Sequence, residues 1–293
     1  MKKNSTIYNI GTFLIFAGPA VFVFLAVVIV PFLYGLYLTF TGWDGISKAK
    51  PFVGFANYAA AFADKAFWKA LGLTLVYVAI SVVLVNVVAF LLALLVTGKI
   101  RFSNFFRAGF FVPNLIGGIV RGYIWQFIFK NSLVYIGDIT NIGIFSKSWL
   151  SSPVTAFLAL IIVTIWQLSG YMMLIYIAGL TGVSDDIREA AKIDGCTDNQ
   201  VTRYIVLPLM RSSVTICLFL TITRCFMVYD LNLALTEGGP FGSTVLAAMH
   251  VYDKAFVSKA YGTGQTEAVI LFLITAVIAV SQAVYNKSKE VEA

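Results

Sequence analysis

Two arginines lie inside long apolar runs of this chain, where a charged side chain is energetically costly and points to a structural or functional role. They are Arg121 and Arg224. Insertion scales put an arginine at the centre of a membrane helix at roughly 2.5–3.5 kcal/mol, so such a residue usually faces a bundle interior or a water-filled cavity. Either arginine therefore suits a polar ligand in a cavity. The alternative is a structural arginine that binds helix-end carbonyls or a carboxylate such as Asp230 or Glu237.

A charged segment, residues 184–211, is the second place where polar chemistry is concentrated. Apolar runs long enough to cross a membrane lie on both sides of it, so we expect the segment to lie in water. Its ionisable residues are Asp185, Asp186, Arg188, Glu189, Lys192, Asp194, Asp198, Arg203 and Arg211.

Two short helices joined by a sharp turn are predicted inside this segment. Ser184 and the two aspartates after it favour a helix start, because they supply a cap and negative charge. Gly195 favours a left-handed end of that helix. Thr197 with Gln200 fits a capping box that begins a second helix, and Pro208 predicts its end before the next apolar run.

Residue patterns for metal or nucleotide chemistry are absent from the sequence. There is no Gly-x-x-x-x-Gly-Lys-Ser/Thr phosphate loop, so we do not expect the chain to hydrolyse ATP unaided. His250 is the single histidine, which excludes an HExxH zinc site and disfavours a hydrolytic triad. Cys196, Cys217 and Cys225 do not have metal-knuckle spacing. We predict no catalytic residue, no metal and no cofactor bound by this chain.

The composition places the chain among proteins that cross the membrane several times. Hydrophobic residues make up 59% of the 293 residues and charged residues only 12%, which leaves too little polar surface to cover a soluble domain. The net charge of +7 does not indicate nucleic-acid binding, because the basic residues cluster at the ends of apolar runs. The predicted fold class is an all-α membrane protein.

Six apolar segments reach roughly the 20 residues that are needed to cross the hydrocarbon core. The predicted spans cover about residues 10–40, 70–97, 108–129, 154–181, 213–233 and 268–285. They form a single transmembrane domain, 1–293. In it the helix pair of 184–211 joins the fourth span to the fifth, and an external loop, 234–266, joins the fifth to the sixth.

Six spans place both termini on the same side of the membrane. Basic residues close to the span ends favour the cytoplasm for the termini and for the segment 184–211. These residues are Lys99, Arg101, Arg107, Arg203, Arg211, Lys287 and Lys289.

The segment 184–211 also carries a family pattern. Glu-Ala-Ala at 189–191 is followed at fixed offsets by Gly195, Ile205, Leu207 and Pro208. This pattern resembles the EAA loop of permease subunits in binding-protein-dependent ATP-binding-cassette importers, which docks on the ATPase. The sequence departs from the usual pattern at Cys196, Asn199 and Thr202. The ATPase-coupling residues implied by the resemblance are Glu189, Ala190, Ala191, Asp194, Gly195, Ile205, Leu207 and Pro208.

A second zone of resemblance lies between the fifth and sixth predicted spans. Its residues are Tyr229, Asp230, Leu235, Thr236, Gly238, Gly239, Pro240, Thr244, Tyr252, Phe256, Tyr261 and Gly262. They resemble the external loop of carbohydrate permeases in the maltose and glycerol-3-phosphate group. Residues 52–58 resemble a sequence motif that often follows the first helix in sugar permeases. In that family the fifth span lines the translocation path. The path candidates are Arg224, Tyr229, Asp230, Asn232 and Arg121.

The resemblance implies a permease subunit of an ATP-driven carbohydrate importer in the cell membrane of a prokaryote. The implied partners are a second homologous permease, two cytoplasmic ATPase subunits that hold ATP and magnesium, and an extracellular solute-binding protein. The implied substrate is a sugar or oligosaccharide. The alternative is a self-sufficient secondary transporter or channel, for which an inverted repeat and membrane-embedded carboxylates would be expected. A membrane enzyme is a more distant alternative.

Overall fold

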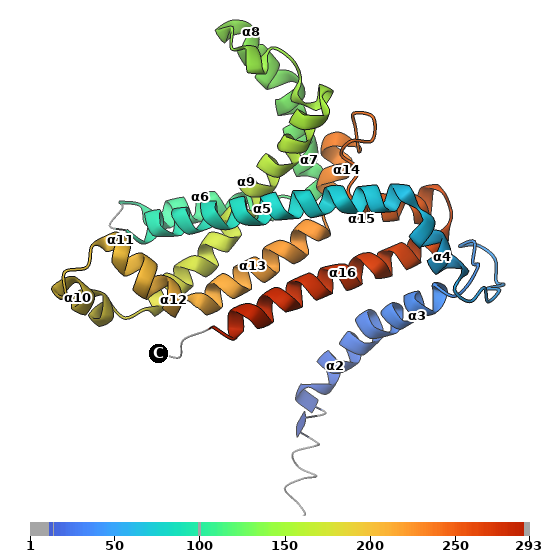
Figure 1. Ribbon diagram of the computed structural model, residues 1–293, viewed down its shortest axis with the longest axis horizontal. Helices are drawn as coiled ribbons and strands as arrows, with labels where there is room; N and C mark the ends of the chain where they lie inside the picture. Colours follow the sequence, from blue (N-terminus) through green and yellow to red (C-terminus); the bar gives the residue numbers. More distant parts are fainter. Residues whose placement is uncertain (1–11, 14, 99–100, 290–293) are drawn as a thin grey trace, which may run out of the picture. The chain divides into compact units, whose positions relative to one another are not determined.

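The computed structural model describes residues 12–13, 15–98 and 101–289, and these residues are helical almost throughout. Within them there is no β-strand, and a single β-bridge joins Thr41 to Phe52. The predicted all-α class is confirmed at this level (Figure 1). The chain divides into two compact units, residues 1–65 with 251–270 and residues 66–250 with 271–293.

Four helices in the described ranges are long and apolar enough to cross a membrane. They are Gly18–Leu38 (α2 Gly18–Phe24, η1 Leu25–Ile29 and α3 Val30–Leu38), α5 Lys65–Thr97, α9 Pro153–Gly182 and α16 Tyr261–Lys287. A fifth is reached if Asp198–Leu209 and Arg211–Phe226, which are bent by 73°, count as one span. The count of six stays a prediction, and residues 10, 11 and 14 of the first predicted span lie outside the described residues.

Two of the predicted spans are interrupted helices, not single ones. Residues 108–129 fall on α6 Ser103–Leu115 and α7 Gly118–Phe127, and residues 213–233 fall on α13 Arg211–Phe226 and α14 Asp230–Thr236. At the first break Ile116 and Gly117 turn to extended backbone, with ψ of 126° and 147°. Pro113 contributes to this break, because it has no N–H for the last turn of α6.

The remaining helical elements are shorter. They are α4 Ala56–Ala63, η2 Ile128–Ser132, α8 Leu133–Thr140, η3 Gly143–Phe145, η4 Trp149–Ser151, α10 Asp185–Ile193, α11 Asp198–Val201, η5 Thr202–Val206, α12 Leu207–Leu209, α15 Ala247–Tyr252 and η6 Asp253–Val257. Of these, α10 and α11 lie at the end of α9 that is remote from α7 and α8 (Figure 1).

The first unit is tied together by the side chain of Asn57. Its amide donates hydrogen bonds to the carbonyls of Thr39 (2.8 Å) and Thr41 (2.9 Å), just past the end of α3. The hydroxyl of Thr263 on α16 donates to the amide oxygen of Asn57 (3.4 Å). A Cβ atom at Gly262 would lie 2.5 Å from the carbonyl oxygen of Thr41, so glycine is required there. The segment 52–58, which resembles a sequence motif of sugar permeases, therefore includes a residue with a structural role, Asn57.

In the second unit, buried polar groups join α9 to α5. The hydroxyls of Tyr77 on α5 and Thr164 on α9 lie 2.5 Å apart. Further along, the Tyr176 hydroxyl donates to the side-chain oxygen of Asn86 (2.8 Å). All four side chains are buried. Because a buried polar group that loses its partner is costly, these two bonds fix one arrangement of α9 against α5.

Small residues bring other helices of the second unit into close contact. At Gly170 on α9 a Cβ atom would lie only 1.7 Å from the carbonyl oxygen of Phe110 on α6. At Gly122 on α7 it would lie 2.4 Å from the Cβ atom of Ala234 on α14. The backbones of α6 and α9, and of α7 and α14, therefore approach more closely than larger residues would allow.

Candidate functional site

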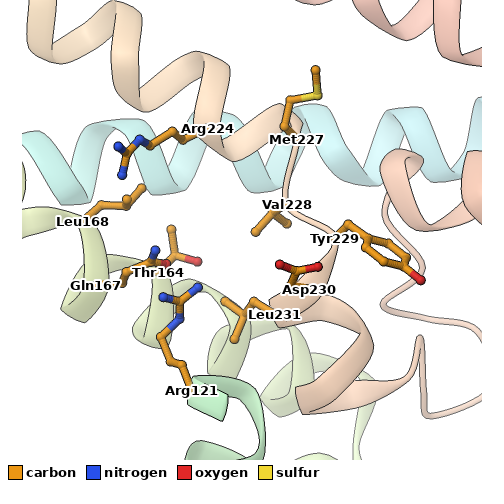
Figure 2. A pocket seen from close by; sticks show the side chains of 10 residues that line it. All are labelled: Arg121, Thr164, Gln167, Leu168, Arg224, Met227, Val228, Tyr229, Asp230 and Leu231. Carbon is orange, nitrogen blue, oxygen red and sulfur yellow. The ribbon is translucent and has the colours of Figure 1, made fainter. Parts of the chain in front are cut away.

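A pocket of about 280 Å³ lies between α7, α9 and the segment that joins α13 to α14 (Figure 2). Its lining residues are Arg121, Thr164, Gln167, Leu168, Arg224, Met227, Val228, Tyr229, Asp230 and Leu231. Figure 2 shows the two arginines entering from opposite sides, with the carboxylate of Asp230 also directed toward the interior. The structure thus brings four of the five predicted path residues together, at the point where two helices are broken.

Arg224 is accessible and is held by two other helices. Its side chain is exposed in this chain and donates a hydrogen bond to the side-chain oxygen of Asn114 on α6 (3.0 Å). Its guanidinium carbon lies 4.7 Å from the ring centre of Tyr171 on α9, a cation–π contact. These contacts orient the guanidinium and leave donors free for a ligand, since an arginine has five N–H groups.

Arg121 has a different environment from Arg224. Its side chain is only 5% exposed and donates to the carbonyl of Ile116 (2.9 Å), at the end of α6. Binding a helix-end carbonyl is what we expect of an arginine with a structural role. Arg121 therefore stabilises the break between α6 and α7. Because it also lines the pocket, it contributes positive charge there.

Asn232, the fifth predicted path residue, does not line the pocket. It is fully buried, and its amide nitrogen donates to the carbonyl of Thr244 (2.9 Å) while its oxygen accepts from the backbone N–H of Leu246 (3.2 Å). These bonds hold the loop between α14 and α15. Asn232 therefore positions that loop, and its assignment to the translocation path stays a prediction.

The charged segment forms the predicted pair of helices, α10 and the helix that begins with α11. Gly195 has φ of +87° and its N–H donates to the carbonyl of Lys192, while the N–H of Cys196 donates to the carbonyl of Ala191. This left-handed helix end is the one predicted. The capping box of Thr197 and Gln200 is also present, with both reciprocal hydrogen bonds.

The second helix of the pair runs past Pro208. It continues through the π-helical turn Thr202–Val206 to Leu209, and the chain then bends at Met210. The helix thus ends one residue after Pro208 and before the next apolar run, as predicted, and the wider turn before Pro208 accommodates its missing backbone donor.

The residues that resemble the EAA loop divide by exposure. Glu189, Ala190, Asp194 and Gly195 are exposed, Ala191 is buried, and Ile205, Leu207 and Pro208 are half-buried. The helix pair also presents Ile193, an apolar side chain that is 87% exposed. An ion pair of Lys192 with Asp198 (2.8 Å) crosses the turn, and the hydrogen bond from that lysine lowers the pKa of Asp198. The exposed side is suited to a protein partner.

Some residues that line the pocket, or that orient a side chain lining it, were not candidates on sequence evidence. Asn114, which orients Arg224, precedes the break between α6 and α7, and nothing in the sequence marks it. Thr164 and Gln167 carry a usable signal, because they are polar and three residues apart in an apolar run, which puts them on one helix face.

Comparison with known proteins places the chain in a family. Residues 85–291 match the family described as "Binding-protein-dependent transport system inner membrane component". The chain is 40% identical, over all 293 residues of both sequences, to a probable starch degradation products transport system permease protein, AmyD, of Thermoanaerobacterium thermosulfurigenes. It is 33% identical over 261 residues, 89% of this chain and 90% of the relative, to the multiple sugar-binding transport system permease protein MsmF of Streptococcus mutans.

Solved structures share the fold. A chain from a bacterial ABC transporter involved in the import of the acidic polysaccharide alginate superimposes with a TM-score of 0.79 at 17% identity, covering 97% of this chain and 99% of that one. The same kind of transporter, in complex with its alginate pentasaccharide-bound periplasmic protein, gives a TM-score of 0.74 at 18% identity, covering 98% and 96%.

The family match covers more than half of the chain, and it names a component of a transport system that depends on a separate binding protein. A self-sufficient transporter or channel and a membrane enzyme are therefore both disfavoured. The chain belongs to the family of binding-protein-dependent transport system inner membrane components, and it is a permease subunit, not an enzyme.

Proposed function

We propose that this permease subunit forms, with a second and homologous permease, the translocation path for a sugar or oligosaccharide. The observation that carries the proposal is the pocket in which Arg224, Arg121 and Asp230 meet inside an otherwise apolar helix bundle. The names of the relatives AmyD and MsmF, which refer to starch degradation products and multiple sugars, support this class of substrate.

The chemistry of the pocket suits carbohydrate hydroxyls. Arg224 offers charged donors, Asp230 an acceptor, and Thr164 and Gln167 both kinds of group. Polar groups at these positions can replace the water that a sugar loses on entering the bundle. At about 280 Å³ the pocket is at the lower limit for a ligand site. It therefore holds part of an oligosaccharide, and the second permease supplies the facing surface.

The helix pair of 184–211 is the proposed contact with two cytoplasmic ATPase subunits, which bind ATP and magnesium in place of this chain. A compact pair with a capped turn can move as a rigid body when its partner moves. Its exposed residues Glu189, Ala190 and Asp194 form the docking face. In this proposal the chain crosses the prokaryotic cell membrane six times with both termini in the cytoplasm, and a solute-binding protein delivers the substrate outside.

The test is an Arg224→Gln variant in the complete importer, reconstituted in proteoliposomes with the solute-binding protein and maltodextrins or other sugars. We expect at least a tenfold lower rate of sugar uptake and of sugar-stimulated ATP hydrolysis, because a hydrogen bond to a charged group contributes roughly 1.5–3 kcal/mol. Thr223→Val is the matched control on the same helix, since the Thr223 hydroxyl binds its own helix (Phe219 carbonyl, 3.0 Å) and does not line the pocket. Unchanged uptake in Arg224→Gln would refute the assignment of this pocket.

A further inference from the structure

Arg188 connects the first helix of the charged pair to the end of α9. It lies on α10, and its guanidinium donates a hydrogen bond to the carbonyl of Leu180. Leu180 is in the last turn of α9, where carbonyls have no partner within the helix. A cation at the carboxyl end of a helix is also favoured by the helix dipole. Arg188 is half-buried in this position, in contrast to its exposed neighbour Glu189.

Two other basic residues of the helix pair, Lys192 and Arg203, contact residues of the pair itself, whereas Arg211, at the end of the segment, donates to the carbonyl of Lys289 (2.8 Å). Lys192 forms its ion pair with Asp198, and both side chains are well exposed. Arg203 stacks on the ring of the adjacent Tyr204, at 5.6 Å from the ring centre. Arg188 differs from both, because the carbonyl that it binds belongs to a helix outside the pair.

The helix that Arg188 binds leads directly to the pocket. Thr164, which lines the pocket, precedes Leu180 by 16 residues on α9, or about 24 Å along a helix axis. Between them lie Tyr171, under the guanidinium of Arg224, and Gly170, in backbone contact with α6. A displacement at the Leu180 end is therefore felt at the Arg224 contacts, because a packed helix of this kind moves as one body.

We propose that Arg188 is a positioning residue for transport: it fastens α10 to α9, so that movement of the coupling helix pair moves the side chains of α9 that line the pocket. The inference rests on the proposed function of the helix pair and of the pocket. It assigns to one side chain the mechanical link between them, which the resemblance to the EAA loop does not specify.

The experiment compares Arg188→Gln and Arg188→Met with Arg188→Lys in the complete importer, reconstituted in proteoliposomes with the solute-binding protein. Two ratios are measured: sugar transported per ATP hydrolysed, and ATP hydrolysis with binding protein relative to hydrolysis without it. Arg203→Gln is the matched control, because it removes the same charge from the same helix pair. Assembly is checked by co-purification of the ATPase subunits.

We expect both ratios to fall in Arg188→Gln and Arg188→Met, the first by roughly tenfold, which corresponds to the loss of one charge-assisted hydrogen bond. The concentration of sugar-loaded binding protein that gives half-maximal transport stays unchanged. Arg188→Lys, which keeps a charged donor, recovers most of both ratios, and Arg203→Gln stays within twofold of wild type.

The proposal is overturned if assembled Arg188→Gln keeps both ratios, or if Arg203→Gln lowers them equally. It is also overturned if neither uncharged variant assembles, because Arg188 would then be an assembly residue. Absence of sugar transport by the wild-type importer would instead refute the proposed substrate class. In that case the second ratio, measured without added sugar, still decides the role of Arg188.

Discussion

Replacing Gly170 by alanine tests the close approach of α6 to α9. The added Cβ atom would lie 1.7 Å from the carbonyl oxygen of Phe110, whereas ordinary contact begins near 3.4 Å. The two helices must therefore separate by about 1.7 Å, the difference between these distances. Asn114 lies four residues beyond Phe110 on α6 and holds Arg224 at 3.0 Å, so the same shift breaks that hydrogen bond.

The expected cost follows from two opposing effects. Overpacking costs about 1–3 kcal/mol, and we expect the upper end because backbone atoms must move. Alanine gains about 1 kcal/mol over glycine in a helix interior. The net loss is about 2 kcal/mol, or roughly 4–8 °C in midpoint of thermal unfolding for a chain of this size.

Thermal unfolding of the purified importer in detergent, followed by sugar uptake in proteoliposomes, measures both consequences of Gly170→Ala. Gly109→Ala is the matched control, because it lies on α6 with no atom within 4 Å of the added methyl group. We expect Gly109→Ala to be neutral or stabilising and to transport normally. If Gly170→Ala were as stable and as active as Gly109→Ala, the close packing of α6 on α9 would be wrong.

Two further predictions concern the helix pair and the first unit. Gly195→Ala should cost about 1–2 kcal/mol at the turn, because φ of Gly195 is +87°, and Gly195→Asn should cost less. Sugar-stimulated ATP hydrolysis and limited proteolysis of the helix pair should therefore show a larger effect for alanine than for asparagine. A larger effect for asparagine would contradict the prediction. Lys254 binds Asp64 at 2.6 Å, and this hydrogen bond raises the pKa of the lysine above 10.5. The pair should contribute about 1 kcal/mol below pH 10.5 and lose it as the pH rises further, so the difference in unfolding temperature between wild type and Asp64→Asn should shrink above that pH; a constant difference up to pH 11.5 would argue against the pair.

Local signals in the sequence specify local structure in this chain. The left-handed end at Gly195 and the capping box of Thr197 and Gln200 depend on the residues themselves and their immediate neighbours, and both are confirmed. The breaks at 116–117 and 227–229 are not predicted by the sequence, because hydropathy carries no information on backbone direction.

The pocket was predictable only in part, for the same physical reason. An arginine in an apolar run needs polar partners or water around its guanidinium, so the sequence marks Arg121 and Arg224 as candidates for the translocation path. Both line the pocket. Which of them is buried against a helix end and which remains accessible depends on the break after α6. Asn232 lies on the same helix as Asp230, yet its amide binds a loop and not the pocket. The direction of the side chain cannot be predicted from sequence position alone.

The indole rings of Trp125 on α7 and Trp166 on α9 lie edge to face, with ring centres 5.3 Å apart. At this separation their electronic transitions couple, and the strength of the coupling changes with the distance and the angle between the rings. Since Gln167 follows Trp166 directly and lines the pocket, this pair gives the protein a built-in optical signal for the α7–α9 spacing. The difference between the circular dichroism spectra of the wild type and of Trp125→Phe would separate this signal from that of the other aromatic residues of the chain.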